Sequence, residues 1–266
     1  CTRTAALPRA VVAYSGGVDP SLLLAVAHEQ LEARALGVIG VSDSYATHEL
    51  ELALAQAGAI GARVETLRTG ELADPAFASN PEDRCYHCKR ELYRKLASVA
   101  EREGGAVMLD GTIADDLTDW RPGRRAAEER DVRSPLAELG FRKADVRAAA
   151  SALGLASAAK PAAPCLASRI PHGTRITREN LSQVEAAEAA LRGLGFGALR
   201  VRHHGETARI EVPEADMATL LAPAVREAVV ARLRALGFRW VALDLAGLRP
   251  GNMNSPGKGH TDAGET

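Results

Sequence analysis

The stretch Ala10-Val11-Val12-Ala13-Tyr14-Ser15-Gly16-Gly17-Val18-Asp19 decides the fold of this chain. It begins with an apolar run typical of a buried strand, continues through two glycines, and leads into a helix that we expect to begin near Pro20. Adjacent glycines let the backbone adopt positive φ values and approach a ligand closely. The free N–H groups at the start of the helix attract an anion such as a phosphate. The alternative is a plain glycine turn between a strand and a helix.

The glycine loop differs from two common phosphate-binding motifs, because it has neither Gly-Lys-Ser/Thr nor the spacing G-x-G-x-x-G. It resembles the loop of the PP-loop ATP pyrophosphatases, which adenylate a substrate and release pyrophosphate. This resemblance implies that ATP is bound by Ser15, Gly16, Gly17, Asp19 and Ser21. It also makes Asp19 a candidate ligand of Mg²⁺, although a carboxylate in the first turn of a helix is equally a good cap.

Composition and charge narrow the class of protein. The chain has 266 residues, 46% of them hydrophobic, which is enough for one large domain or two modest ones. A formal net charge of -1 argues against a nucleic-acid-binding surface. No apolar run is long enough to cross a membrane, and the first residues lack an apolar signal segment, so we expect a cytoplasmic protein. There are four cysteines, which in a reducing compartment indicate metal binding or catalysis rather than disulfides.

Strand and helix patterns alternate over the first part of the chain, which predicts an α/β fold with a doubly wound parallel sheet. The expected strands are Val11–Tyr14, Leu36–Val41, Arg63–Leu67 and Ala106–Asp110. The expected helices are Ser21–Arg34, Thr47–Ala59, Cys88–Arg102 and Lys143–Leu153. Ligands of such sheets lie at the carboxyl ends of the strands. Asp43, Ser44, Gly111 and Thr112 follow strands there, so they are candidates for contact with adenine or ribose or else simple turn residues.

The pattern changes after residue 158. We expect a nucleotide-binding domain over 1–158, a Pro- and Ala-rich linker over 159–177, a smaller α+β domain over 178–250 for substrate binding or oligomerisation, and a disordered tail over 251–266. In the smaller domain the expected helices are Thr177–Leu194 and Ala215–Leu236, and the expected strands are Leu199–His203, Ala208–Val212 and Trp240–Leu245.

Cysteines form the second candidate site. Cys85-Tyr86-His87-Cys88 places two sulfurs within reach of one centre, and Cys165 supplies a third. From these residues alone, a redox dithiol, a zinc site and an iron–sulfur site all remain open.

Basic residues form the third candidate site. Ser168 and Arg169 form a potential anion-binding turn, and Arg200 and Arg202 share one face of a strand. These four residues are candidates for binding a substrate phosphate, the alternative being a solvated basic face. We expect Glu188 to lie at the surface of its helix.

Taken together, these residues resemble the LarE family of sulfur transferases over nearly the whole chain. The resemblance is carried by Asp83-Arg84-Cys85-Tyr86-His87-Cys88-Lys89, Leu109-Asp110-Gly111-Thr112, Asp119-Trp120-Arg121-Pro122-Gly123, Ser168-Arg169-Ile170-Pro171-His172-Gly173, Val201-Arg202-His203-His204, Ala208-Arg209-Ile210-Glu211 and Leu243-Asp244-Leu245. It implies the PP-loop, adenine nucleotide alpha hydrolase-like fold and a role in making the nickel-pincer nucleotide cofactor of lactate racemase. The implied substrate is pyridinium-3,5-biscarboxylic acid mononucleotide, whose carboxylate is adenylated by ATP and converted to a thiocarboxylate.

The sulfur source differs within this family. One type sacrifices a cysteine four residues before the Ser-Arg turn, but that position is Pro164 in this chain. The other type holds a 4Fe-4S cluster on three cysteines, which correspond to the catalytic candidates Cys85, Cys88 and Cys165. The resemblance therefore implies the cluster-dependent type and a homo-oligomer, with the donor of the sulfide unknown.

Rival interpretations explain fewer of these features. A tRNA thiolase of the same superfamily would need a basic surface for RNA. An amide-forming ligase would leave the cysteines without a role, and a nucleotide-binding module would use them for structural zinc.

The glycine loop departs from the family at one position. The aspartate is usually followed directly by serine, whereas here Pro20 intervenes before Ser21. Proline suits the first position of a helix but removes an N–H and a hydroxyl that could contact pyrophosphate. We therefore expect weaker ATP binding than a serine at position 20 would give.

Overall fold

The computed structural model describes residues 7–249, which divide into two compact units. Within the described residues, the first unit comprises 7–166 and 175–178, and the second comprises 167–174 and 179–249. The tail expected over 251–266 lies outside the described residues. None of the helices in the described part has the length and apolar character needed to span a membrane.

A four-stranded parallel sheet forms the centre of the first unit. Its strands are β1 (Ala10–Ala13), β2 (Ala35–Val41), β3 (Arg63–Arg68) and β4 (Val107–Leu109), in the order β3-β2-β1-β4. The sheet confirms the α/β prediction, and each expected strand agrees with an observed one to within two residues. The strand order reverses at β1, so the glycine loop that follows β1 lies at the switch point where such sheets bind ligands.

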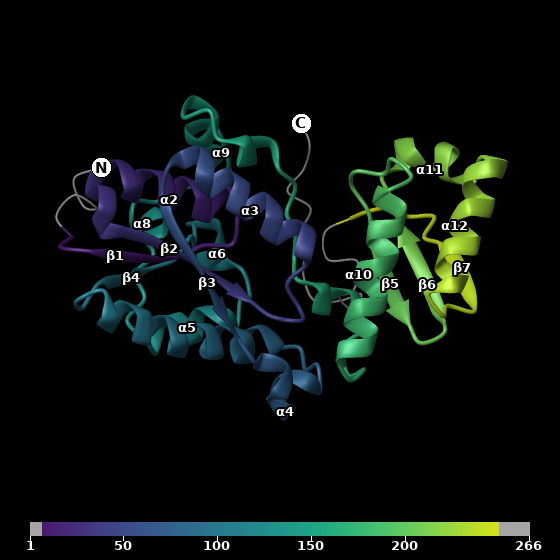
Figure 1. The fold of residues 1–266 in the computed structure, drawn as a ribbon, viewed down its shortest axis with the longest axis horizontal. Coiled ribbons are helices and arrows are strands. Elements are labelled where there is room, and N and C mark those ends of the chain that lie inside the picture. The colour runs from purple at the N-terminus through teal and green to yellow at the C-terminus, as the bar shows by residue number, and fades with distance from the viewer. Residues whose placement is uncertain (1–6, 250–266) are drawn as a thin grey trace. The chain divides into compact units, whose positions relative to one another are not determined.

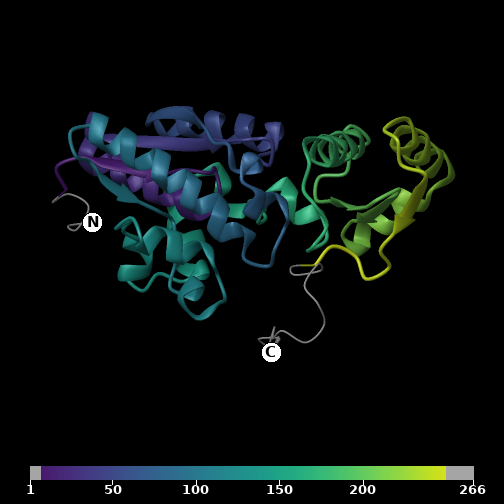
Figure 2. The same cartoon turned by 90° about the horizontal axis from the view of Figure 1, so that it is seen from below.

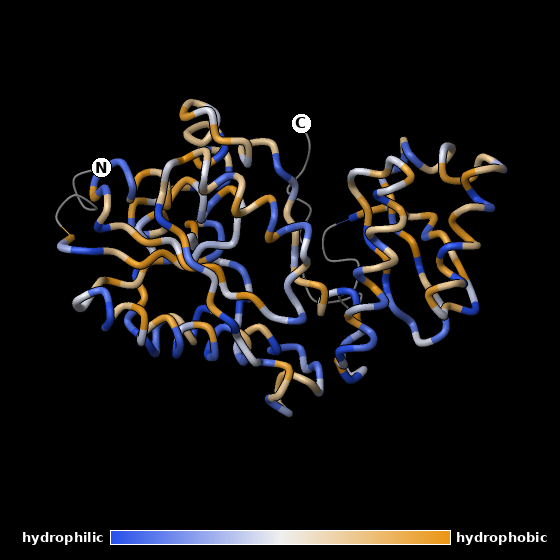
Figure 3. The backbone as a smooth tube through the Cα atoms, viewed as in Figure 1, coloured by the Kyte–Doolittle hydropathy of each residue, from blue (hydrophilic) through white to orange (hydrophobic). Residues whose placement is uncertain are grey.

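Helices cover both faces of this sheet. α2 (Val18–Leu31), α3 (Thr47–Ile60) and α9 (Lys143–Ala152) lie on one side, and α5 (Arg84–Arg102) and α7 (Gly123–Glu128) on the other (Figure 1). The inner strands β1 and β2 are apolar on both faces, whereas the edge strand β3 carries polar residues such as Arg63 and Glu65. Helix α5 alternates between apolar and hydrophilic positions (Figure 3). This pattern is typical of a parallel sheet buried on both sides.

The start of α2 corrects one prediction. The helix begins at Val18, with Gly17 as its N-cap, so Pro20 is the third helical residue rather than the first. The N–H of Ser21 donates to the carbonyl of Gly17 at 3.0 Å and closes the first helical hydrogen bond. Proline is tolerated at the third position because no N–H of the first turn has an intrahelical acceptor.

The segments between these elements carry short helices that the sequence patterns did not predict. These are η2 (Glu71–Ala73), α4 (Pro75–Ala78), α6 (Asp115–Thr118), α8 (Pro135–Glu138) and η3 (Ala156–Ala159). A further short helix, η1 (Glu32–Arg34), falls within the helix expected over 21–34. In addition, α5 begins at Arg84 rather than Cys88, so both cysteines of the C-x-x-C pair lie at the start of this helix.

The second unit contains a three-stranded sheet in the order β5-β6-β7. β5 (Arg200–His204) is antiparallel to β6 (Thr207–Glu211), which is parallel to β7 (Trp240–Leu243). α10 (Arg178–Arg192) and α12 (Pro223–Ala235) lie side by side against this sheet (Figure 2).

Two further elements complete the second unit. They are η4 (Leu166–Arg169), at its boundary with the first unit, and α11 (Glu214–Leu221). The prediction of a single helix over 215–236 is wrong, because α11 ends before Ala222 and a second helix, α12, begins at Pro223. Proline cannot continue a helix that precedes it but is well suited to the first turn of a new one.

The two loop glycines should respond differently to substitution. Gly16 has a φ of 68°, and a Cβ atom there would lie 2.6 Å from the Cβ of Ala53. Gly16→Ala should therefore lower the free energy of unfolding by about 2–4 kcal/mol, measured by urea denaturation. Gly17 is the matched control, because its φ is -71° and the nearest neighbours of an added Cβ are 3.7 Å away. Gly17→Ala should change stability by less than about 1 kcal/mol; equal losses in the two variants would contradict this account.

Candidate functional site

The carbonyl groups of the glycine loop are held by neighbouring side chains. The Tyr45 hydroxyl donates to the carbonyl of Ser15 at 3.0 Å, and Lys160 Nζ donates to that of Gly16 at 3.4 Å. Since the peptide group is planar and trans, the N–H groups of Gly16 and Gly17 point away from these donors. Among the described residues neither N–H donates to a protein acceptor. These N–H groups are therefore free to bind an anion.

The loop after β4 packs directly on the start of α2. A Cβ atom at Gly111 would lie 2.7 Å from the backbone nitrogen of Pro20, so only glycine fits there. Thr112 is fixed by Asp110, which accepts hydrogen bonds from the Thr112 N–H at 3.1 Å and its hydroxyl at 3.0 Å. Asp110 also accepts hydrogen bonds from Tyr93 and Ser134. Gly111 and Thr112 therefore lie beside the glycine loop, as the prediction requires.

Two other predicted ATP contacts are buried. Ser21 is completely buried in α2. Ser44 is also buried, and its hydroxyl donates to Glu71 Oε1 at 2.8 Å in a network that includes Ser42. Ser44 also accepts a hydrogen bond from the N–H of Leu166 through its carbonyl oxygen, at 2.8 Å. The structure therefore places Ser44 between β2 and the segment that carries Cys165.

The three predicted cysteines share one region of the first unit. Cys85 and Cys88 lie one turn apart on α5, and Cys165 precedes the residue that is bonded to Ser44. Desolvation, followed by the charge of Cys165, raises the pKa of Cys85. Desolvation, followed by the charges of Glu71 and Cys165, raises the pKa of Cys88. Within residues 7–249 no group of three or more His, Cys, Asp or Glu side chains is arranged to hold a metal ion.

An ion pair at the glycine loop was not predicted from the sequence. Lys143 Nζ lies 2.8 and 2.7 Å from the two carboxylate oxygens of Asp19. Lys143 is the first residue of α9, and its backbone N–H donates to Asp115 Oδ2 at 2.8 Å. A lysine 124 residues from its partner gives no local sequence signal, so only the tertiary structure reveals it.

Two of the predicted phosphate contacts in the second unit form buried ion pairs. Arg169 donates through Nε and Nη2 to Glu188 at 2.8 and 3.1 Å. Arg202 donates in the same way to Glu211 at 2.9 and 2.8 Å. Glu188 is 1% exposed, so the expectation of a surface residue is wrong. Because bidentate pairing uses the guanidinium donors that a phosphate would take, these arginines serve mainly to hold the unit together.

Arg200 differs from these two arginines. It donates to the carbonyl of Arg249 at 3.2 Å, and within the described residues it forms no salt bridge with a carboxylate. Desolvation, followed by the charges of Arg202 and Arg169, lowers its pKa. Ser168 lies in the same group, because Arg169 donates to its hydroxyl and Arg202 to its carbonyl. The structure thus brings the four predicted phosphate contacts together and leaves Arg200 as the available cation.

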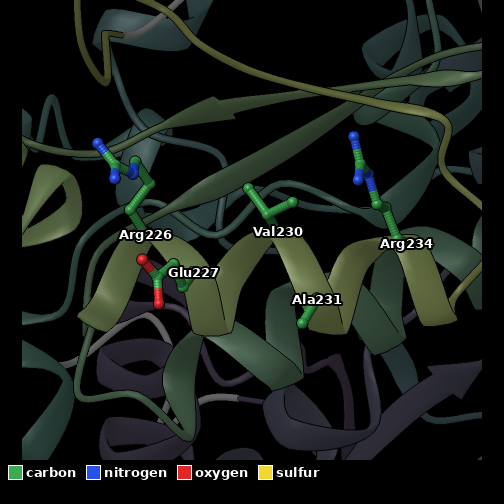
Figure 4. A pocket seen from close by; sticks show the side chains of 5 residues that line it. All are labelled: Arg226, Glu227, Val230, Ala231 and Arg234. Carbon is green, nitrogen blue, oxygen red and sulfur yellow. The ribbon is translucent and has the colours of Figure 1, made fainter. Parts of the chain in front are cut away.

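Two hollows on the surface of residues 7–249 contain none of the predicted site residues. One is lined by Arg226, Glu227, Val230, Ala231 and Arg234, all from one face of α12 (Figure 4). The other, in the first unit, is lined by Leu117, Glu128, Asp131, Val132, Arg133, Ser134, Ala137 and Glu138. A shallow hollow along a single helix offers too few converging polar groups for a small-molecule site.

Comparison with known proteins identifies the family. No family model matches the chain. Over 249 residues it is 41% identical to the pyridinium-3,5-bisthiocarboxylic acid mononucleotide synthase of Lactiplantibacillus plantarum, covering 93% of this chain and 90% of that protein. The chain belongs to the LarE family. This membership confirms the resemblance at the level of the family, and the PP-loop assignment of the sheet rests on it.

Two uncharacterized proteins are also similar to this chain. One, from Synechocystis sp., is 44% identical over 93% of this chain and 92% of its own length. The other, from Methanocaldococcus jannaschii, is 29% identical over 88% of each chain.

Substitution of the two strand arginines should separate structural from ligand-binding roles. Arg202→Met would leave Glu211, which is 0% exposed, without its bidentate partner. Its free energy of unfolding should fall by about 3–5 kcal/mol. Arg200→Met breaks no ion pair between side chains in the described residues, so the loss should be below about 1 kcal/mol. Urea denaturation of both variants provides the comparison, and similar small losses would refute the structural role of Arg202.

Proposed function

We propose that this chain is an ATP-dependent sulfur transferase that acts on pyridinium-3,5-biscarboxylic acid mononucleotide in nickel-pincer cofactor biosynthesis. The observation that carries the proposal is the 41% identity, over 90% of its length, to a protein named as the synthase of the corresponding bisthiocarboxylic acid. The glycine loop at the switch point of a parallel sheet supports it independently, because this geometry suits a nucleotide.

ATP is needed because a carboxylate is a poor electrophile. Adenylation joins a carboxylate oxygen to the α-phosphorus of ATP and releases pyrophosphate, so that AMP becomes the leaving group when sulfur attacks the carbonyl carbon. We propose that the N–H groups of Gly16 and Gly17 and the start of α2 bind the negatively charged phosphates. We propose that the Asp19 carboxylate would be a ligand of the Mg²⁺ ion that accompanies ATP.

For the sulfur source we propose a 4Fe-4S cluster held by Cys85, Cys88 and Cys165. Pro164 occupies the position of a sacrificial cysteine and has no sulfur to give. Three thiolates are a suitable donor set for such a cluster, and the effect of the neighbouring sulfurs on the pKa values of Cys85 and Cys88 supports their proximity. When bound, the cluster would supply an iron-held sulfide as the nucleophile. Because the pKa values of Cys85 and Cys88 are raised, cluster assembly should release protons.

For the substrate phosphate we propose Arg200, with Ser168 beside it. Arg200 lies in a group of three arginines of which the other two are neutralised by buried carboxylates. His203 and His204 add no positive charge near neutral pH, because desolvation lowers the pKa of both. The family resemblance also leads us to propose a homo-oligomer.

Iron and sulfide analysis after anaerobic purification tests the cluster. The wild-type protein should be brown and contain about four irons per chain, and Cys165→Ala should lose them. Cys1→Ala is the matched control, because Cys1 is the cysteine outside the proposed ligand set, and this variant should keep its iron. Circular dichroism of Cys165→Ala should match that of the wild type. A colourless protein that holds only zinc, or no metal after anaerobic reconstitution, would overturn the cluster and leave an adenylating enzyme with another sulfur source.

A further inference from the structure

The ammonium groups of Lys143 and Lys160, which both follow β4 in the chain, lie beside the glycine loop. Lys143 pairs with Asp19, and Lys160 Nζ lies 3.4 Å from the Gly16 carbonyl oxygen and 2.6 Å from Glu49 Oε2. Both lysines therefore lie where α2 begins. Neither lysine carries a sequence pattern that predicts a place at this site.

The position of Lys143 is not explained by the stability of the fold, although Asp19 and Glu49 balance the charges of the two lysines. The start of a helix carries a partial positive charge and repels cations. An ion pair between a side chain that is 45% exposed, as in Lys143, and one that is 20% exposed, as in Asp19, contributes little to stability because solvent screens it. A partly exposed lysine held beside the glycine loop by a single carboxylate is instead available to the phosphates of a bound nucleotide.

We propose that Lys143 binds the β- and γ-phosphates of ATP, and that its ion pair with Asp19 is the nucleotide-free arrangement of the site. The inference rests on the proposed function, because it requires ATP as the ligand. On binding, the Asp19 carboxylate exchanges the ammonium for the metal ion that accompanies the nucleotide, and the ammonium moves to the phosphates. No bond is made or broken, and each charge keeps an opposite partner.

The backbone around Lys143 suits this exchange. The N–H of Lys143 donates to Asp115 Oδ2 at 2.8 Å, and the N–H of Arg142 donates to Asp145 Oδ2 at 2.9 Å. These bonds fix the start of α9 relative to the loop after β4. The half-exposed side chain remains free to change partners, because it is not packed into the core.

Pro20 gives Lys143 a particular importance in this chain. As the third residue of α2, Pro20 removes one of the N–H groups that a helix start offers to a phosphate. The ammonium of Lys143 carries three donors and lies within hydrogen-bond distance of Asp19, the residue before this proline. We infer that Lys143 compensates for the missing donor.

Calorimetric titration with Mg-ATP and Mg-AMP tests the proposal. Lys143→Met should weaken Mg-ATP binding by about tenfold or more but change Mg-AMP binding by less than about twofold, because AMP lacks the β- and γ-phosphates. Lys143→Arg should retain part of the affinity. Arg63→Met is the matched control, since it also removes an exposed cation with a carboxylate partner but lies at the amino end of β3. Its affinity for Mg-ATP should equal that of the wild type.

A double-mutant cycle with Pro20→Ser tests the compensation. Pro20→Ser alone should tighten Mg-ATP binding, and Lys143→Met should cost less in that background than in the wild type. Wild-type affinity for Mg-ATP in Lys143→Met would overturn the inference while leaving the proposed function intact. Failure of the wild-type protein itself to bind Mg-ATP would overturn the proposed function and this inference with it. Urea denaturation should give Lys143→Met a midpoint close to that of the wild type, which excludes misfolding as the cause of lost affinity.

Discussion

Close backbone packing around the glycine loop is the constraint on which the first unit depends. Gly16 leaves no room for a side chain beside Ala53, and Gly111 leaves none beside Pro20. These two close contacts bring the loops after β1 and β4 together at the switch point of the sheet. With the carbonyl groups of the loop held by Tyr45 and Lys160, the N–H groups are left for a ligand. Close packing and these two hydrogen bonds therefore support the proposed nucleotide site.

Charge is organised differently in the two units. In the second unit Arg169 and Arg202 are 7% and 3% exposed, and their carboxylate partners are almost completely buried. Separating such a pair would leave an unpaired charge in the interior, so these pairs are permanent. In the first unit the pair of Lys143 with Asp19 is partly exposed, and each partner can find another counter-ion at low cost. Permanent pairs build the structure, whereas exchangeable pairs suit a site that binds and releases a charged ligand.

The sequence was sufficient to predict the parallel sheet, because continuous apolar runs and glycine turns are local signals. It was not sufficient for the start of α2, where the helix extends two residues ahead of Pro20, or for the break that Pro223 introduces before α12. The glycines and cysteines stand out in the sequence because their residue types carry chemistry. The structure places the glycine loop at the switch point of the sheet, and the cysteine cluster stays a prediction. The burial of Glu188 and the ion pair of Lys143 with Asp19 were missed, because a charged residue on a helix gives no sign of a partner contributed by a distant segment.

We propose that this member of the LarE family transfers sulfur to an adenylated carboxylate. The most direct measurement is mass spectrometry of pyridinium-3,5-biscarboxylic acid mononucleotide incubated anaerobically with the protein, ATP, Mg²⁺ and sulfide. The account predicts a product in which sulfur replaces a carboxylate oxygen, with one AMP formed for each sulfur added and more than one product molecule per chain. An unchanged substrate mass with the iron-loaded protein, or AMP formed without sulfur entering the product, would contradict it.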